Sequence, residues 1–328
     1  MEKVNWGILG CGDVTEVKSG PAFNRVENSR LVAVMRRNAE LAADYARRHE
    51  VPAWYSNADD LIHDKNVNAI YVATPPGSHA ELSIQAMKAG KPVYVEKPMA
   101  LNYAECRQMI KVSEETGMPL FVAYYRRALP GFVKVKELIG SGTIGPVKLI
   151  NLHLYKSPSR EEQNGALPWR VMPEISGGGH FFDLASHQLD YLDFLFGPVE
   201  GVEGVAFNQA GLYKAEDIVS AHFVFGQKIL ATGSWCFSVP EFLQRDSIEI
   251  IGEKGSIRMS CFDFTPIELI HSSGRQIFEY SKPKHVQYPY IKPVVEELTG
   301  RRNPRNTAIS AARTSRVMDE VVSGYYTR

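Results

Sequence analysis

The sequence predicts an α/β protein with an N-terminal doubly wound parallel sheet and a C-terminal α+β domain built on a largely antiparallel open sheet. A chain of 328 residues usually folds as two domains and can bury a large core. Up to about residue 123, short apolar runs alternate with amphipathic helices, which is typical of parallel sheets. From residue 124 onward, strand-like segments follow one another between turns, which indicates an antiparallel sheet. We therefore expect domains at 1–123 and 124–328, with the last helices able to pack back on the first domain.

In the first domain, apolar runs predict strands that end near polar or glycine-rich turns. These strands are Val4–Leu9, Leu31–Met35, Ala69–Thr74, Val93–Val95 and Leu120–Ala123. Helical spacing fills the intervals between them, and the expected helices are Val14–Val26 (broken at Gly20-Pro21), Ala39–His49 (capped by Asn38), Ala80–Ala89 and Tyr103–Thr116. This alternation predicts a Rossmann-type sheet.

In the second domain, a glycine-rich stretch precedes a strongly apolar helix at Phe181–Phe196. The expected strands are Val147–Tyr155, Val199–Phe207, Ile218–Phe225, Lys228–Phe237, Ser247–Ile251, Ser256–Met259 and Ile267–Ile270. The end of the chain, from Tyr288 to Tyr326, again has helical spacing. We expect helices to cover one face of this second sheet.

The composition excludes several function classes. Lys and Arg number 37 and so do Asp and Glu, so the balanced charge gives no electrostatic case for nucleic acid or for an anionic membrane. The chain has no apolar stretch long enough to span a bilayer, and its first residues enter a strand without room for a signal peptide. Four scattered cysteines are typical of reduced thiols. We expect a cytoplasmic protein.

The most informative segment is the glycine-rich turn within residues 7–16, between the first strand and the first helix. Such a turn presents backbone N–H groups and a helix N-terminus to a pyrophosphate. Gly10 permits the tight turn and Gly12 the close approach of the phosphates, while Asp13 and Val14 begin the helix. Thr15 replaces the third glycine of the G-x-G-x-x-G pattern, so we expect helix and strand to pack slightly further apart. The turn predicts a dinucleotide cofactor.

The end of the second strand indicates which nicotinamide cofactor is preferred. An acidic residue at this position binds the adenosine ribose 2′-hydroxyl, whereas arginine suits a 2′-phosphate. Here Arg36 and Arg37 occupy the position, and no Asp or Glu is present. The two arginines could also be a solvated start to the next helix. We favour NADP(H) over NAD(H), which stays possible, because a guanidinium can pair with a phosphate and stack on adenine.

Three further segments complete a recognisable combination. They are Thr74-Pro75-Pro76-Gly77-Ser78-His79, Val95-Glu96-Lys97-Pro98, and the run from Gly177-Gly178-Gly179-His180 through Asp183 to His187. Together with the glycine turn they resemble the glucose–fructose oxidoreductase, inositol dehydrogenase and rhizopine-catabolism family (Gfo/Idh/MocA). Shorter matches extend the resemblance over essentially the whole chain, at Tyr125-Arg126-Arg127, Gly145-Pro146-Val147, Pro168-Trp169-Arg170 and Ala311–Ser315.

The resemblance implies that Lys97, Asp183 and His187 meet above the nicotinamide. His187 would be the acid/base, because its ordinary pKa of about 6.5 suits proton transfer to or from a hydroxyl. Lys97 would stabilise a developing alkoxide, and Asp183 would orient His187. The Lys97–Pro98 peptide would be cis. The resemblance also places Thr74, Pro75, Pro76, His79, Glu96 and Lys97 along the cofactor.

Asp183 and His187 are four residues apart on an expected helix, so both should project from one face, with His180 on the same face. His180 would contact substrate or cap the helix. The pattern could also be that of metal ligands, but hydride transfer assisted by lysine needs none, and we expect no metal. Candidates for contact with a polyhydroxylated substrate are His180, Tyr155, Trp169 and Arg170, with Arg160 nearby.

The expected function is therefore NADP(H)-dependent interconversion of a hydroxyl and a carbonyl on a sugar, cyclitol or related polyol. Two alternatives use the same scaffold: a glycoside hydrolase that oxidises its substrate transiently with bound NAD, and a regulator that senses NAD(P) without catalysis. By resemblance, the second sheet would pair with that of another copy to form a homodimer or homotetramer. Alternating apolar residues in Ile218–Phe225 and Lys228–Phe237 are compatible with burial of both sheet faces.

Overall fold

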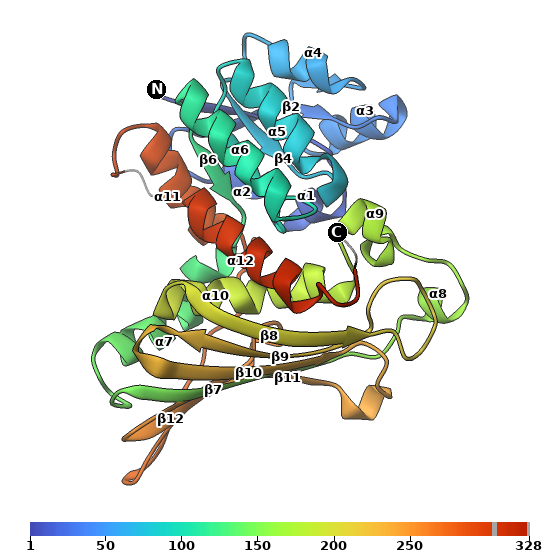
Figure 1. The fold of residues 1–328 in the computed structure, drawn as a ribbon. Helices are drawn as coiled ribbons and strands as arrows, with labels where there is room; N and C mark the ends of the chain where they lie inside the picture. Colours follow the sequence, from blue (N-terminus) through green and yellow to red (C-terminus); the bar gives the residue numbers. More distant parts are fainter. Residues whose placement is uncertain (304–306, 327–328) are drawn as a thin grey trace. The chain divides into compact units, whose positions relative to one another are not determined.

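The computed structural model describes residues 1–303 and 307–326 (Figure 1). The chain forms two compact units. The first contains Met1–Arg126 together with Pro283–Ala312, and the second contains Arg127–Lys282 and the chain from Arg313 onward. The last described helix is therefore shared between the units, since the division falls inside it.

The first unit contains a six-stranded sheet in the order β3-β2-β1-β4-β5-β6, with every neighbouring pair parallel. Its strands are β1 (Val4–Leu9), β2 (Ser29–Met35), β3 (Ala53–Tyr55), β4 (Ala69–Val72), β5 (Val93–Val95) and β6 (Leu120–Val122). The central strands β1, β4 and β5 are almost entirely buried, as parallel strands covered on both faces must be. The predicted parallel sheet and its five predicted strands are confirmed, whereas the short edge strand β3 was missed.

Helices connect these strands in the expected alternation. They are α1 (Asp13–Val17), α2 (Gly20–Phe23), α3 (Ala39–Arg48), α4 (Ala58–His63), the 3₁₀ turn η1 (Pro76–Ser78), α5 (His79–Lys88) and α6 (Tyr103–Thr116). The predicted break at Gly20 separates α1 from α2, and the Asn38 side chain caps α3 by accepting a hydrogen bond from Leu41 N. The helix α4 was not predicted.

The segment 283–312 also belongs to this first unit. It contains α11 (Tyr288–Leu298) and the start of α12 (Thr307–Val321). Ala308, Ala311 and Ala312 join the same core as Val93 and Val95. The unit is thus closed by a part of the chain more than two hundred residues distant from β5.

The second unit contains an eight-stranded sheet in the order β14-β13-β12-β11-β7-β10-β9-β8. Its strands are β7 (Val147–Tyr155), β8 (Val199–Phe207), β9 (Ile218–Phe225), β10 (Ile229–Cys236), β11 (Arg245–Gly252), β12 (Gly255–Met259), β13 (Ile267–His271) and β14 (Gly274–Phe278). Only the β7–β10 pair is parallel, so the predicted, largely antiparallel sheet is confirmed. The edge strand β14 was not predicted.

Helices of the same unit cover one face of this sheet, and the other face is exposed. The helical elements of the unit are α7 (Pro130–Gly140), α8 (Arg160–Gln163), α9 (Pro173–Ser176), α10 (Ser186–Phe196), the end of α12, and 3₁₀ turns that include η2 (Tyr125–Ala128), η3 (Trp169–Val171), η5 (Gly226–Lys228) and η6 (Glu241–Leu243). The helix α10 lies along the sheet (Figure 1), where Trp235 Nε1 donates to Gln188 Oε1 at 2.7 Å. In β9, buried and exposed residues alternate, so the face opposite α10 is exposed.

Candidate functional site

The turn between β1 and α1 depends on Gly10. Its φ of +89° lies in the region that favours glycine, and an added Cβ would lie 2.7 Å from Thr74 Cγ2. The N–H groups of Gly10 and Cys11 both donate to Met35 O, at 2.9 and 3.0 Å. The turn is therefore held against the ends of β2 and β4, the two strands that flank β1.

Gly12 differs from Gly10 in its surroundings. An added Cβ there would meet no atom of the described residues within 4 Å, so the protein itself does not demand glycine. Gly12 stands at the start of α1, whose first residues are Asp13 and Val14. The space in front of it is what close approach of a pyrophosphate requires, so the turn fits a dinucleotide. Thr15 is buried, and its hydroxyl donates to Gly12 O at 2.8 Å.

Arg36 and Arg37 directly follow β2, and both are exposed. Arg36 N donates to Tyr55 O at 3.2 Å, which ties the residue to β3. Burial raises the pKa of the Cys11 thiol to about 11, and the charge of Arg36 acts in the opposite direction. Arg36 is therefore close enough to act electrostatically on the glycine turn. Neither guanidinium bonds to another residue within the described parts of the chain.

The loop after β4 carries Thr74, Pro75 and Pro76, and His79 fastens it to the loop after β5. The His79 ring is fully buried, with Nε2 2.7 Å from Thr74 O and Nδ1 2.9 Å from Pro98 O. Both carbonyls only accept, so a neutral ring bonds one of them and only the imidazolium bonds both. Burial lowers the pKa of His79, against the effect of these carbonyls. The His79 ring thus lies between the loops that carry Thr74 and Lys97, and in its neutral form it donates to one of the two carbonyls.

Glu96 lies in a buried hydrogen-bond network rather than on an open surface. Its Oε1 accepts from the Tyr71 hydroxyl and from Gln287 Nε2, both at 2.5 Å, and its Oε2 accepts from Lys97 N at 3.2 Å. Gln287 in turn accepts from the Tyr94 hydroxyl at 2.8 Å. The carboxyl group therefore connects β4, β5 and the returning segment 283–312 of the same unit.

Lys97 follows β5 directly and is partly exposed. The Lys97–Pro98 peptide is cis, which confirms what the resemblance implied. Because β1, β4 and β5 are neighbours in a parallel sheet, the glycine turn, the Thr74 loop and Lys97 all lie at one sheet edge. The first unit thus brings together the residues predicted within it.

In the second unit, the glycine run 177–179 is fixed by close packing. A Cβ on Gly178 would lie 2.1 Å from the Phe182 ring, so no other residue fits there. Gly179 N lies 2.9 and 3.0 Å from the two carboxyl oxygens of the buried Glu216, which also accepts from the Tyr326 hydroxyl at 2.5 Å. The run is therefore held to the segment before β9.

The predicted helix at Phe181–Phe196 begins with a π-helical turn, η4 (Phe181–Ala185), and α10 begins at Ser186. Of His180, Asp183 and His187, only His187 lies in the regular α-helix, and the face that the three would share stays a prediction. His187 is buried, with its ring 6.0 Å from that of Phe262.

Asp183 lies beside two other predicted residues. Its Oδ2 is 3.4 Å from Arg170 Nε, and the Arg170 guanidinium stacks over the Trp169 ring at 4.5 Å. The short 3₁₀ turn Trp169–Val171 places both side chains. The structure therefore brings together Trp169, Arg170 and Asp183, as a substrate-facing cluster would need.

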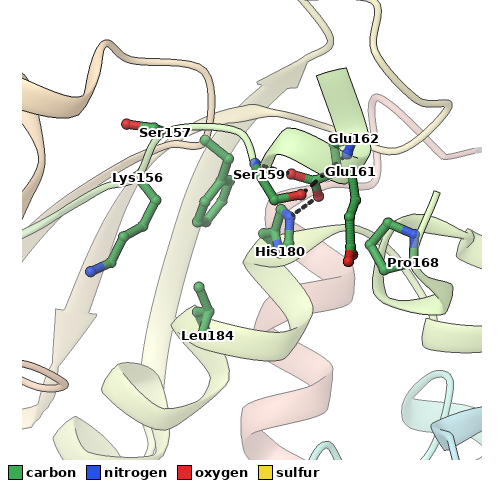
Figure 2. A pocket seen from close by; sticks show the side chains of 9 residues that line it. Lys156, Ser157, Ser159, Glu161, Glu162, Pro168, His180 and Leu184 are labelled. Atoms are coloured by element: carbon green, nitrogen blue, oxygen red, sulfur yellow. Dashed lines mark hydrogen bonds and ion pairs between the residues drawn. The ribbon is translucent and has the colours of Figure 1, made fainter. Parts of the chain in front are cut away.

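His180 pairs with a residue that the sequence analysis did not single out. Its Nε2 lies 2.6 Å from Glu162 Oε1, and the two side chains line one pocket (Figure 2). The pocket has a volume of about 320 Å³. His180 occupies the N-cap position of the π-turn, where its side chain makes no capping hydrogen bond.

Tyr155 and Arg160 lie on other elements than Trp169, Arg170 and Asp183. Residues alternate along β7, and Leu154 is buried with its partner Trp235 on the face that α10 covers. Tyr155 consequently lies on the opposite face, where its hydroxyl is 2.8 Å from Ser234 Oγ. Arg160 is exposed at the start of α8, beside Glu161 and Glu162. Contact of either residue with substrate stays a prediction.

The described residues were also compared with the requirements of a metal site and of a membrane-spanning helix. Those residues include no group of three or more His, Cys, Asp or Glu side chains arranged to hold a metal ion. None of the helices in the described ranges is both long enough and apolar enough to cross a membrane. All four cysteines are free thiols, and only Cys236 is not buried.

Comparison with known proteins identifies the family. Residues 4–124 match "Oxidoreductase family, NAD-binding Rossmann fold" of the GFO_IDH_MocA group, and residues 132–258 match the "GFO/IDH/MocA C-terminal domain". Oxidoreductase P35 of Formosa agariphila is 38% identical over 322 residues, which cover 97% of this chain and 98% of that protein. The chain belongs to the Gfo/Idh/MocA oxidoreductase family. Its first unit is an NAD-binding Rossmann domain.

More distant proteins are similar to this Gfo/Idh/MocA protein in sequence or in fold. The 1,5-anhydro-D-fructose reductase of Ensifer adhaerens is 27% identical over 256 residues, covering 77% of this chain and 74% of the reductase. The crystal structure of the aldose–aldose oxidoreductase from Caulobacter crescentus, complexed with glycerol, superimposes with a TM-score of 0.85 at 23% identity. That match covers 97% of this chain and 96% of the other, and it shows the same fold.

Three site residues of this family member escaped the sequence analysis: Glu162, Glu216 and Gln287. Glu162 carried a local signal, because Ser159 and Glu162 form a capping box at the start of α8. That motif explains the helix start but gives no sign of His180, which is 18 residues away. The partners of Glu216 and Gln287 are also distant in sequence, so no spacing rule connects them.

We predict that Glu96→Ala destabilises the Rossmann unit. The change leaves the buried hydroxyl of Tyr71 and the amide of Gln287 without this acceptor, at a cost of about 3 kcal/mol or more. A thermal scan should show Tm lowered by roughly 6 °C or more. The exposed Glu81→Ala on α5 is the matched control and should shift Tm by less than about 2 °C. Equal effects of the two changes would show that the network does not stabilise the fold.

Proposed function

We propose that this protein is an NADP(H)-dependent oxidoreductase that interconverts a hydroxyl and a carbonyl group on a sugar, cyclitol or related polyol. The observation that carries the proposal is the sheet edge of the first unit. There the glycine turn, the Thr74 loop and Lys97 follow three adjacent parallel strands. Ligands of open α/β sheets bind outside this edge, where the strand order reverses between β1 and β4. The name of the Ensifer reductase supports a sugar-like substrate.

The roles of the catalytic residues follow the chemistry of the reaction. The cofactor accepts a hydride from the carbinol carbon in oxidation and returns it in reduction. His187 takes the hydroxyl proton as the carbonyl forms, and it gives the proton back in reduction. Lys97 donates a hydrogen bond to the reacting oxygen, and Asp183 orients the substrate or His187. Lys97 and His187 belong to different compact units, so their pairing rests on the family resemblance.

The preference for NADP(H) rests on Arg36 and Arg37. They are exposed, follow β2, and have no ion-pair partner among the described residues, while Arg36 acts electrostatically on the glycine turn. An unpaired guanidinium at this position is suited to a ribose 2′-phosphate.

We predict that NADPH binds more tightly than NADH, and that Arg36→Asp weakens NADPH binding by about tenfold or more while changing NADH binding little. The variant removes the cation that would pair with the 2′-phosphate, a group that NADH lacks. Fluorescence titration of the purified protein measures both affinities. Arg47→Asp, on the exposed face of α3, is the control and should keep the preference. Tighter binding of NADH to the unmodified protein would refute the assignment.

We predict that Lys97→Met and His187→Asn each lower kcat by about a hundredfold or more while NADPH binding is retained. The assay is NADPH oxidation with a panel of keto-sugars, using those that the unmodified protein reduces. Lys88→Met on α5 and His63→Asn on α4 remove the same residue types from exposed positions. The kcat of each control variant should be close to that of the unmodified protein. Full turnover in either catalytic variant would exclude that residue from the chemistry.

We also propose that the chain self-associates through the open face of the second sheet. Apolar side chains are exposed there in two pairs: Leu230 (54% exposed) lies beside Val224 on β10 and β9, and Phe207 (57% exposed) lies near Val205 on β8. Val224 and Leu230 are direct partners in the β9–β10 ladder, so they form one apolar surface. Burial of such a surface against a second copy is favourable.

We predict a dimer or tetramer in sedimentation velocity at micromolar concentration, shifted toward monomer by Leu230→Asp. The buried charge would oppose contact between the two apolar surfaces. Leu41→Asp on α3 of the other unit places the same charge on an exposed leucine and should leave the distribution unchanged. A monomeric unmodified protein would remove the proposal.

A further inference from the structure

The pocket that contains His180 lies wholly within the second unit and has the size of a small-ligand site. Its volume of about 320 Å³ is at the lower end of the range for small-molecule sites, which suits a single ring. The residues that line it are Lys156, Ser157, Ser159, Glu161, Glu162, Pro168, His180, Leu184 and Phe237 (Figure 2). We propose that this pocket is a subsite for one neutral pyranose, recognised through the Glu162–His180 pair. The choice of a sugar rests on the proposed function.

The Glu162–His180 pair has a defined hydrogen-bond direction. Burial alone would raise the pKa of Glu162, but the hydrogen bonds from His180 and Ser159 lower it overall. Glu162 is therefore a carboxylate, which can only accept, so Nε2 of His180 carries the proton between them. Ser159 N donates to the other carboxylate oxygen at 2.7 Å, so Glu162 is fixed by a capping box. The acidic residue thus orients the imidazole, as in Asp–His pairs of enzymes.

This arrangement leaves Nδ1 of His180 for a ligand. Nε2 is already bonded to Glu162, and no described residue bonds Nδ1. In the neutral ring, Nδ1 has a lone pair that accepts from a hydroxyl group. A polar side chain with an atom that no described residue bonds therefore lines one small pocket, and a hydroxyl of a polyhydroxylated ring can bond to it.

The remaining lining suits the carbon face of a sugar ring. Phe237 packs beside His180, with 5.3 Å between ring centroids, and Pro168 and Leu184 add carbon surface that is partly exposed. A pyranose has a C–H face that packs on such groups and hydroxyls that bond around its rim. An apolar ligand would leave the Nδ1 atom of His180 without a hydrogen-bond partner, which disfavours such a ligand.

The charges of the lining favour a neutral sugar over an acidic one. Lys156 Nζ lies 3.5 Å from Asp263 Oδ1, and Glu162 is paired with His180, so these charges have protein partners. Glu161 is exposed and contributes a further negative charge. A carboxylated or phosphorylated sugar would therefore be repelled by Glu161 without gaining an unpaired cation.

The position of the subsite connects it to the proposed chemistry. Leu184 lines the pocket and directly follows Asp183 on the same π-turn, and His180 starts that turn. A sugar unit held by His180 would be positioned by the segment that carries Asp183 and leads into α10. We assign His180 and Glu162 to substrate selection and positioning.

Ligand-observed saturation-transfer NMR on the full chain tests the subsite directly. The probes are D-glucose, D-galactose, D-mannose and D-xylose as neutral pyranoses, with D-glucuronate as the acidic comparison. We expect at least one neutral pyranose to bind and to bind more tightly than D-glucuronate. His180→Gln and Glu162→Gln should each weaken that binding by about tenfold or more. Gln163→Ala, an exposed change on the same short helix, is the matched control and should retain binding.

A readout on the unmodified protein covers the case in which a variant misfolds. The ¹⁵N resonances of the His180 ring should shift on addition of the sugar that binds. Binding by none of the four neutral sugars, binding indifferent to both variants, tighter binding of D-glucuronate, or unshifted His180 resonances would each overturn the subsite.

Activity assays separate this subsite from the proposed reaction. Sugar binding that depends on His180, without NADPH-linked turnover of any keto-sugar, would leave the subsite standing and refute the proposed reaction. Turnover with KM unchanged in both variants would keep the reaction and refute the subsite. A raised KM with kcat nearly unchanged is the result that supports both.

Discussion

The buried carboxyl group of Glu96 is the constraint on which the site of the first unit depends. It accepts bonds from Tyr71 on β4 and Gln287 before α11, and from the N–H of Lys97. A buried carboxyl group is costly without such donors, so these segments must stay together for the unit to be stable. The lysine at the sheet edge is thus supported by a residue whose own side chain faces the protein. The E-K-P motif combines a buried anchor with a partly exposed functional side chain.

The second unit uses buried acids in the same way. Glu216 binds Gly179 N and so holds the glycine run, while Asp190 accepts from Arg127 Nε and Asp193 accepts from Arg313 Nε, both at 2.7 Å. These bonds fix both ends of the segment that begins with the glycine run and continues through the π-turn into α10. Because such bonds are charge-assisted or buried, they are stronger than surface pairs. The turn that carries His180 and Asp183 is therefore positioned by partners on other elements.

The sequence predicts periodicity well and long-range side-chain pairing poorly. Strands such as Val147–Tyr155 were predicted with the observed bounds, because apolar alternation is a local signal. The short edge strand Ala53–Tyr55 has no such run and was missed. The π-turn Phe181–Ala185 was not predicted, because a π-turn leaves no mark in residue spacing. The partnership of Glu162 with His180 depends on how α8 folds back over the unit, which no single-segment pattern contains.

The contacts also divide the predicted site residues into two kinds. Glu96 and His79 already bond to other protein groups, so their chemistry serves the architecture of the sheet edge. The open space beside the Gly12 Cα, the Arg36 guanidinium and the Nδ1 atom of His180 have no such contacts among the described residues. Buried polar groups in proteins normally have hydrogen-bond partners. Polar groups that have none in the protein, and that lie beside well-fixed residues, are therefore positions where a ligand can bind. The phosphates of the cofactor and the hydroxyls of a sugar are the chemistries that these open positions match.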